Sequence, residues 1–154
     1  MRQHRAETVS WFFQDLNLIG HQTALENAAM GLLCRGVPRA TALSKAFESL
    51  QLLEIAHLAR RHPHQLSRGQ AQRVAFARAH ASKAKIILAD EPTGCLDPET
   101  AEAVMAQLRQ LSKSSGRTVV VVTHNHILAH RFCDRVLECG PQGLRDITVR
   151  PKST

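Results

Sequence analysis

Apolar residues near the start of the chain follow first a strand-like and then a helix-like pattern. The β-prone run 9–13 ends at a polar turn, which predicts a short strand followed by a loop. Thr23 and Glu26 have the three-residue spacing of a capping box, in which two side chains satisfy backbone N–H groups at a helix start. We therefore expect a helix from this point to about Cys34.

The helical period continues beyond this first helix. Gly36 and Pro38 interrupt it, and apolar residues within 42–53 then recur on one face of a second helix. Residues 54–60 predict a third, short helical piece. The stretch 20–65 is consequently expected to be a small helical unit without a strand.

Strands and helices alternate in the remainder of the chain. The pattern predicts capped helices at 67–82 and 97–113, buried strands at 85–89 and 118–123, a short helix at 127–132, and final strands at 135–139 and 144–149. Continuous apolar strands are typical of parallel sheets that are covered on both faces. We therefore expect an α/β fold with the helical unit inserted at the edge of its sheet.

Composition places the chain among ordinary globular proteins. Its 154 residues are 44% hydrophobic and 21% charged, and this length can bury a core without disulfides. No apolar run approaches the roughly 20 residues that cross a bilayer, and the first residues lack the apolar stretch of an export signal. The four cysteines form no C-x-x-C pair, which fits reduced thiols in the cytoplasm.

A net charge of +7 raises nucleic acid or an anionic membrane surface as partners. The distribution of the charge argues against nucleic acid, because the longest basic run is the pair Arg60–Arg61 and no aromatic residue interleaves with the charges. Histidines at 124, 126 and 130 lack the common zinc spacings with cysteine. We therefore expect neither a nucleic-acid partner nor a structural zinc ion.

Two acidic residues directly follow a predicted buried strand. Asp90 and Glu91 lie at the carboxyl end of this strand, and α/β sheets bind their ligands at the carboxyl ends of their strands. One carboxylate there can hold Mg²⁺ through water while its neighbour polarises an attacking water, as phosphoanhydride hydrolysis requires. A salt-bridged loop start would account for the same pair. His124 ends the next predicted strand, so we expect it to face the same crevice, as a catalyst or as an ordinary polar group.

A third candidate is the helix start at 66–70. Free amides, the Ser67 hydroxyl and the Cβ-free Gly69 together suit a phosphate group. A simple capped helix would carry the same residues.

The order of these segments resembles the nucleotide-binding domain of ABC transporters. The segments are FFQ at 12–14, LSRGQAQRVAFARA at 66–79, IILADEPTGCLD at 86–97 and TH at 123–124. Residues 17–40, together with ADEPTGCLD, are similar to the group that includes lipoprotein-releasing, macrolide-export and cell-division ATPases. The resemblance covers nearly the whole chain.

This resemblance implies a single truncated ABC ATPase domain over 1–154. Its fold would be a partial P-loop NTPase (RecA-like) parallel sheet formed by 1–19 and 66–154, with 20–65 as an inserted helical subdomain. The chain would be an ATP-binding subunit that couples ATP binding and hydrolysis to transport through a membrane permease. It would pair with a second ABC ATPase subunit and lie in the cytoplasm, on the inner face of the membrane.

The resemblance assigns the MgATP contacts residue by residue. Gln14 matches the glutamine that touches Mg²⁺ and the attacking water. Asp90 matches the Mg²⁺-coordinating aspartate, and Glu91 matches the catalytic glutamate. His124 matches the histidine that contacts the γ-phosphate. Cys95 departs from the asparagine usual in this group.

The remaining matched residues belong to the dimer contacts of the family. Ser67, Gly69 and Gln70 match the signature segment, which contacts the γ-phosphate held by the opposite subunit. Asp97 matches the aspartate of the loop that follows the catalytic glutamate. Arg68 departs from the usual glycine of the signature.

The phosphate-cradling loop of P-loop ATPases has no counterpart in this sequence. A G-x-x-x-x-G-K-[ST] motif is required, and no Gly-Lys pair occurs. In the resembled family this loop, its strand and an adenine-stacking aromatic precede the strand at 9–13, so we expect them before Met1. We therefore predict no useful ATPase activity for the chain alone, and sheet edges that need a partner's strand.

Two other interpretations stay open on the sequence. The chain could be a non-catalytic interaction or regulatory half-domain, or a decayed remnant, that lends its signature to a complete partner. It could also belong with the soluble relatives that act on ribosomes or DNA, for which strongly salt-dependent nucleic-acid binding would be the indication.

Overall fold

The fold is given by a computed structural model that describes residues 9–13, 16–94 and 96–148. Its helices and strands follow one another in this order: β1 (Val9–Phe13), α2 (Ala24–Leu33), α3 (Arg39–Leu52), the 3₁₀ turns η1 (Ala56–Leu58) and η2 (Pro63–Gln65), α4 (Arg68–Ala81), β2 (Ile86–Asp90), α5 (Pro98–Ser115), β3 (Thr118–Val122), α6 (His126–Phe132), β4 (Leu137–Gly140) and β5 (Gly143–Asp146). The predicted alternation of strands and helices is confirmed.

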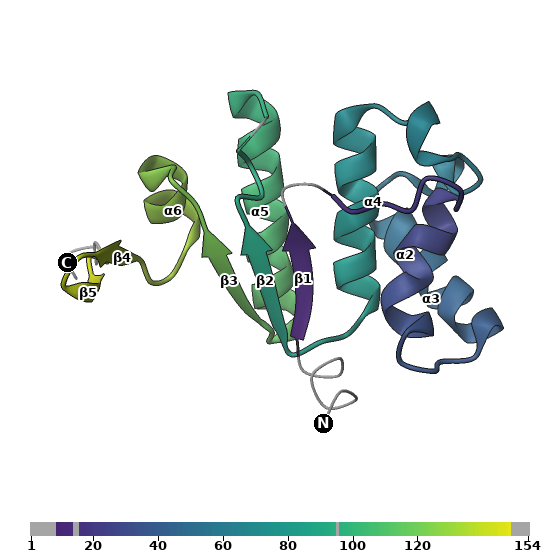
Figure 1. The fold of residues 1–154 in the computed structure, drawn as a ribbon, viewed down its shortest axis with the longest axis horizontal. Helices are drawn as coiled ribbons and strands as arrows, with labels where there is room; N and C mark the ends of the chain where they lie inside the picture. The colour runs from purple at the N-terminus through teal and green to yellow at the C-terminus, as the bar shows by residue number, and fades with distance from the viewer. Residues whose placement is uncertain (1–8, 14–15, 95, 149–154) are drawn as a thin grey trace.

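Strands β1, β2 and β3 form a parallel sheet in that order (Figure 1). Helices α4 and α5 lie against one of its faces. Phe12 of β1 meets Phe76 of α4 edge to face, with ring centroids 6.2 Å apart. Ile87 and Ala89 of β2 are buried on the same face. The predicted α/β class with a parallel sheet is therefore confirmed.

Strand β3 departs from its prediction as a strand buried on both faces. Its residues alternate in exposure: Val119 and Val121 are half-buried, whereas Val120 is 44% and Val122 59% exposed. The physical reason is that α5 covers only one face, and no described helix covers the other. The β-branched run at 118–122 therefore predicted the strand correctly. The prediction that this strand is buried was wrong.

The final two strands also depart from the prediction. Strand β4 begins at Leu137 instead of 135, and β5 ends at Asp146 within the predicted range 144–149. The two strands pair with each other in an exposed antiparallel hairpin, apart from the three-stranded sheet (Figure 1). Among the described strands β3 has only β2 as a neighbour, and β4 does not pair with the outer edge of β3.

Helices α2 and α3 pack against α4 on the side away from the sheet (Figure 1). The capping box before α2 is confirmed: Thr23 Oγ1 accepts a hydrogen bond from Glu26 N, and Glu26 Oε2 accepts one from Thr23 N. The short helical piece expected at 54–60 is the 3₁₀ turn η1, and η2 was not predicted. The region between β1 and α4 is accordingly helical in the described residues.

His80 joins α3 to α4 near the end of α4. Its Nδ1 lies 2.9 Å from Ser49 Oγ. Burial lowers the pKa of His80 below its ordinary value of 6.5, and the charges of Arg117 and Lys83 lower it further. The neutral imidazole is therefore the form that suits the folded chain.

Acidification should destabilise the fold through this histidine. Because the pKa of His80 is lower in the folded than in the unfolded chain, its contribution is present above about pH 6.5 and is lost as the pH falls through the folded pKa. Urea unfolding at pH 7.5 and pH 5 should give a smaller free energy at pH 5, and His80→Gln should reduce that difference. The exposed His57→Gln serves as control, and equal pH dependence in all three proteins would contradict the assignment.

Candidate functional site

Glu91 leaves β2 in a backbone conformation that is rare for a residue other than glycine. Its φ is +43°, in the left-handed region. The Glu91 N–H donates to Val122 O at 2.9 Å, so the turn is held against the end of β3. Backbone strain of this kind concentrates at functional sites, where the surrounding structure maintains it.

The turn brings Glu91 to His124. Glu91 Oε1 accepts a hydrogen bond from the His124 backbone N–H at 2.9 Å, and the same oxygen lies 3.5 Å from His124 Nε2. The carboxylate side chain is 19% exposed, whereas the imidazole is fully exposed. Both residues line one open hollow, together with Thr93, Thr123 and Asn125. The structure thus brings together the two strand-end residues that the sequence placed in one crevice.

This pair combines a fixed carboxylate with an accessible imidazole. A carboxylate held by a backbone N–H can accept a proton from a water positioned beside it. An exposed imidazole next to it can donate a hydrogen bond to an anionic group that enters from solvent. The arrangement suits attack of water on a phosphoryl group.

The structure says less about Asp90 and Gln14, the two residues that the resemblance assigns to Mg²⁺. Asp90 is the last residue of β2, and it is exposed. Gln14 lies outside the described residues. Within the described ranges, no group of three or more histidine, cysteine or acidic side chains could hold a metal ion. Asp90 is therefore a single carboxylate, which suits a cation that keeps most of its water ligands, as Mg²⁺ does.

The signature residues lie in a different hollow from Glu91 and His124. Ser67 Oγ accepts from Gln70 N at 3.2 Å, and Gln70 Oε1 accepts from Ser67 N at 2.9 Å, which is a complete capping box at the start of α4. A Cβ atom on Gly69 would meet no atom within 4 Å. This hollow is shared with Glu99 and Thr100 of α5. Ser67, Gly69 and Gln70 thus line a different hollow from Glu91 and His124, whereas Arg68 of the signature segment lines a small hollow together with Glu91.

Asp97 serves as the N-cap of α5. Its Oδ1 accepts a hydrogen bond from Thr100 N at 3.0 Å. Hydrogen bonds from the Thr100 side chain and backbone hold the pKa of Asp97 below its usual range. The carboxylate therefore stays ionised at the start of the helix, where the helix dipole favours negative charge.

Two polar residues of α4 that the sequence analysis did not select hold the loops of the site. Arg78 donates through Nη1 to Asn17 O at 2.8 Å and through Nη2 to Leu16 O at 2.7 Å. The buried Gln72 donates to Pro92 O at 2.7 Å, directly after Glu91. Their signal in the sequence is the presence of polar side chains within an otherwise alanine-rich helix.

Several known proteins are similar to this chain in sequence. A sequence model described as "ABC transporter" matches residues 1–94. The methionine import ATP-binding protein MetN of Cupriavidus necator is 40% identical over 134 residues, which are 86% of this chain and 39% of MetN. The lipoprotein-releasing system ATP-binding protein LolD of Myxococcus xanthus is 43% identical over 138 residues, which are 90% of this chain and 62% of LolD.

A solved structure has the same fold. The ATP-binding cassette MJ0796, in a dimeric post-hydrolysis state bound to ADP and Pi, aligns with a TM-score of 0.76 and 41% identity. The alignment covers 88% of this chain and 60% of that cassette. The chain thus spans less than two thirds of each of these three proteins.

Replacing Arg78 should destabilise the fold measurably. Burial lowers the pKa of Arg78, and Arg78→Met leaves the Leu16 and Asn17 carbonyls without their donors. We expect the free energy of unfolding in urea to fall by about 2–3 kcal/mol. Arg73→Met, at an exposed position of the same helix, should change it by less than about 0.5 kcal/mol. Equal effects of the two substitutions would contradict the role given to Arg78.

Proposed function

This chain belongs to the ABC transporter family, and we propose that it is the part of an ABC ATPase that supplies the catalytic carboxylate, the γ-phosphate histidine and the signature segment. In this role it couples ATP binding and hydrolysis to transport through a membrane permease. The observation that carries the proposal is the contact of Glu91 with His124 at the ends of two adjacent parallel strands. Glu91 orients and deprotonates the attacking water, and His124 contacts the γ-phosphate.

The residues of the chain fit one end of MgATP. Asp90 and Gln14 would hold Mg²⁺, and the Glu91–His124 pair would flank the γ-phosphate. The rest of the nucleotide requires a phosphate cradle, and the sequence contains no Gly-Lys pair that could form one. ATP therefore binds productively only when a phosphate-binding loop is added to the surface formed by this chain.

The proposed partners are a second ABC ATPase subunit and a membrane permease. The separate position of the signature supports its use on a nucleotide held by a second ABC ATPase subunit, and the dimeric state of the MJ0796 cassette supports the same pairing. We propose that the helical region 20–65 contacts the permease, as the resemblance implies, and that the chain acts at the cytoplasmic face of the membrane. Within the described residues, no helix is both long and apolar enough to span a bilayer.

The purified chain alone should not turn over MgATP. Without a P-loop lysine and its amide cradle, most of the electrostatic stabilisation of phosphoryl transfer is absent. Phosphate release should stay at the level of a buffer blank and should be the same for wild type and Glu91→Gln. Turnover that Glu91→Gln abolishes would contradict this expectation.

The signature can be tested on a nucleotide held by another subunit. LolD of Myxococcus xanthus with its own signature disabled should regain MgATP turnover when this chain is added. Gly69→Asp should reduce the regained turnover at least about tenfold, because its carboxylate repels the γ-phosphate while the site has room for the side chain. Gln51→Asp adds the same charge at an exposed position of α3 and is the matched control. Equal turnover with both variants would contradict the proposal.

A further inference from the structure

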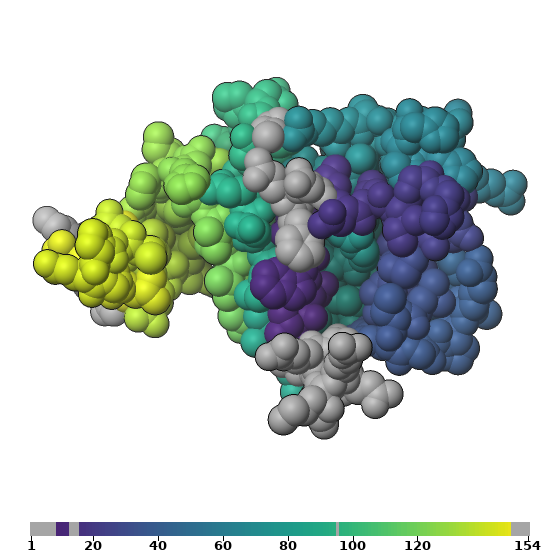
Figure 2. All heavy atoms as spheres, in the orientation of Figure 1, coloured from purple at the N-terminus to yellow at the C-terminus, as the bar shows by residue number. Residues whose placement is uncertain are grey.

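Gln72 is a buried polar side chain in a helix that is packed on several sides. Helix α4 contacts β1, α2 and α3, and its atoms appear between those of β1 and α2 in the space-filling view (Figure 2). Gln72 is only 6% exposed, and its Nε2 donates to Pro92 O at 2.7 Å. Because the Pro92 carbonyl can only accept a hydrogen bond, the side-chain amide keeps Nε2 toward Pro92 and Oε1 turned away from it.

The Oε1 atom of Gln72 is a buried acceptor without a donor. No group of the described residues donates a hydrogen bond to it. Burying an acceptor without a donor is costly, and native proteins satisfy nearly all such atoms with protein groups or with ordered water. We therefore expect a donor for Oε1, or room for one, beside Gln72.

A small hollow beside Gln72 has room for one water molecule. Its volume is about 10 Å³, which is close to the smallest volume that holds a water. The polar side chains in its lining are Arg68, Gln72 and Glu91. Arg68 and Gln72 are four residues apart in α4, so they lie on the same side of the helix. A water in this hollow would have the two to four polar partners that a buried water needs.

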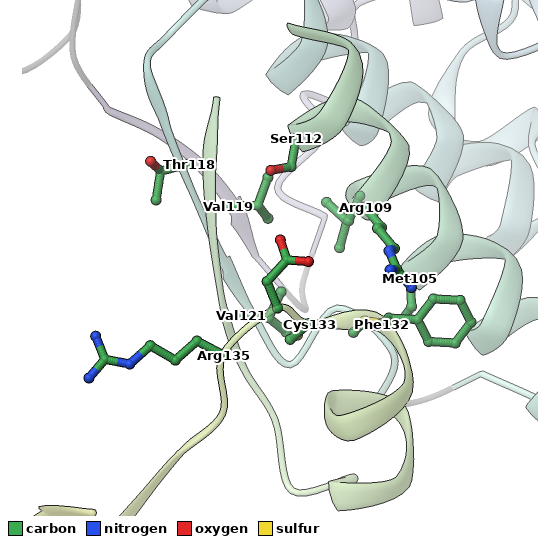
Figure 3. A pocket seen from close by; sticks show the side chains of 11 residues that line it. Met105, Arg109, Ser112, Thr118, Val119, Val121, Phe132, Cys133 and Arg135 are labelled. Atoms are coloured by element: carbon green, nitrogen blue, oxygen red, sulfur yellow. The ribbon is translucent and has the colours of Figure 1, made fainter. Parts of the chain in front are cut away.

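The larger cavity beside β3, of about 290 Å³, differs because its polar groups have partners (Figure 3). Ser112 Oγ donates to Arg117 O at 2.8 Å, and Asp134 pairs with Lys113 at 3.0 Å. None of the buried polar atoms that lack a partner within the described part of the chain belongs to the lining of this cavity. The small hollow is therefore distinguished by its unmet acceptor and not by its size.

We propose that Gln72 is a positioning residue for Glu91, and that the hollow holds one ordered water that donates to Gln72 Oε1 and to an oxygen of Glu91 and accepts from Arg68. Gln72 holds the turn directly through Pro92, and the water holds it through Glu91. These contacts are here called the α4 strut. The inference rests on the proposed function, because a carboxylate that deprotonates the attacking water must keep its position.

Arg68 makes the α4 strut a feature of this chain. The resemblance gives a glycine at this position, and glycine has no side chain that could donate into the hollow. Arg68 is exposed and takes part in no ion pair among the described residues, so its guanidinium is available to the water. Gln72 also lines the hollow of Ser67 and Gly69. The strut therefore joins the signature to the turn that carries Glu91.

Hydrogen exchange by NMR tests the strut on the 154-residue chain without nucleotide. The Glu91 and His124 amides report on the turn, because both are hydrogen-bonded there. Gln72→Met nearly keeps the side-chain volume and removes both polar atoms, so exchange at these two amides should become about tenfold faster. The Thr118 amide, which bonds β3 to the residue before β2, should change by less than about twofold. This contrast separates positioning from a general loss of stability.

Variants of Arg68 test the water. Water–protein NOEs should show a long-lived water beside the Gln72 side-chain amide in the wild type. Arg68→Ala should weaken this signal and make exchange at Glu91 and His124 about threefold faster, whereas Arg68→Lys, which also donates, should preserve both. Arg73→Ala, at an exposed position of the same helix, is the matched control. Loss of Arg68 cannot act by weakening α4, because a cation at a helix N-terminus opposes the helix dipole.

Three results would overturn the α4 strut. They are equal changes of exchange at Glu91, His124 and Thr118 in Gln72→Met, the lack of a long-lived water beside Gln72, and equal exchange in Arg68→Ala and its control. If Gln72→Met does not fold, the variants of Arg68 carry the test. Because no measurement uses nucleotide, a strut without regained turnover in the LolD mixture would count against the proposed function alone. Regained turnover with an unchanged exchange pattern would count against the strut alone.

Discussion

The close packing of helix α4 is the constraint on which the rest of the structure depends. Most of its buried side chains are alanines, so α2, α3 and β1 can all approach its backbone closely. Two polar residues of α4 extend the same arrangement to the loops: Arg78 holds the segment after β1, and Gln72 holds the turn after Glu91. Helix α4, which Ser67 caps, thus fixes the positions of two loops of the candidate site.

The geometry of the candidate site depends on a second constraint, the parallel register of β2 and β3. Asp90 stands opposite Val122, so Glu91 emerges beside the end of β3. The left-handed turn at Glu91 costs of order 1–3 kcal/mol and is offset by its hydrogen bonds to Val122 and His124. A carboxylate held in this way changes its position little when a phosphoryl group arrives, which is what preorganised catalysis needs.

Local signals in the sequence predicted local structure well. The capping residues Thr23 and Ser67 fixed two helix starts, and the apolar run before Asp90 identified β2, because these features act within a few residues. The burial of β3 was predicted wrongly. A run of valines shows that a strand can be covered by apolar side chains on both faces, but it does not show whether other elements of the chain cover it. Arg78 was missed because its partners are carbonyls about 60 residues away. The role of Gln14, outside the described residues, stays a prediction.

The separation of the two hollows has a consequence for how a nucleotide can be bound. The Glu91–His124 pair and the signature at Ser67 open onto different parts of the surface. If both sets act on ATP, each must complete a site whose remaining walls come from elsewhere: a phosphate-binding loop beside Glu91, and another subunit's nucleotide at the signature. In the proposed function, this chain would therefore contribute to two incomplete sites, and its activity would depend on which surfaces are brought to each.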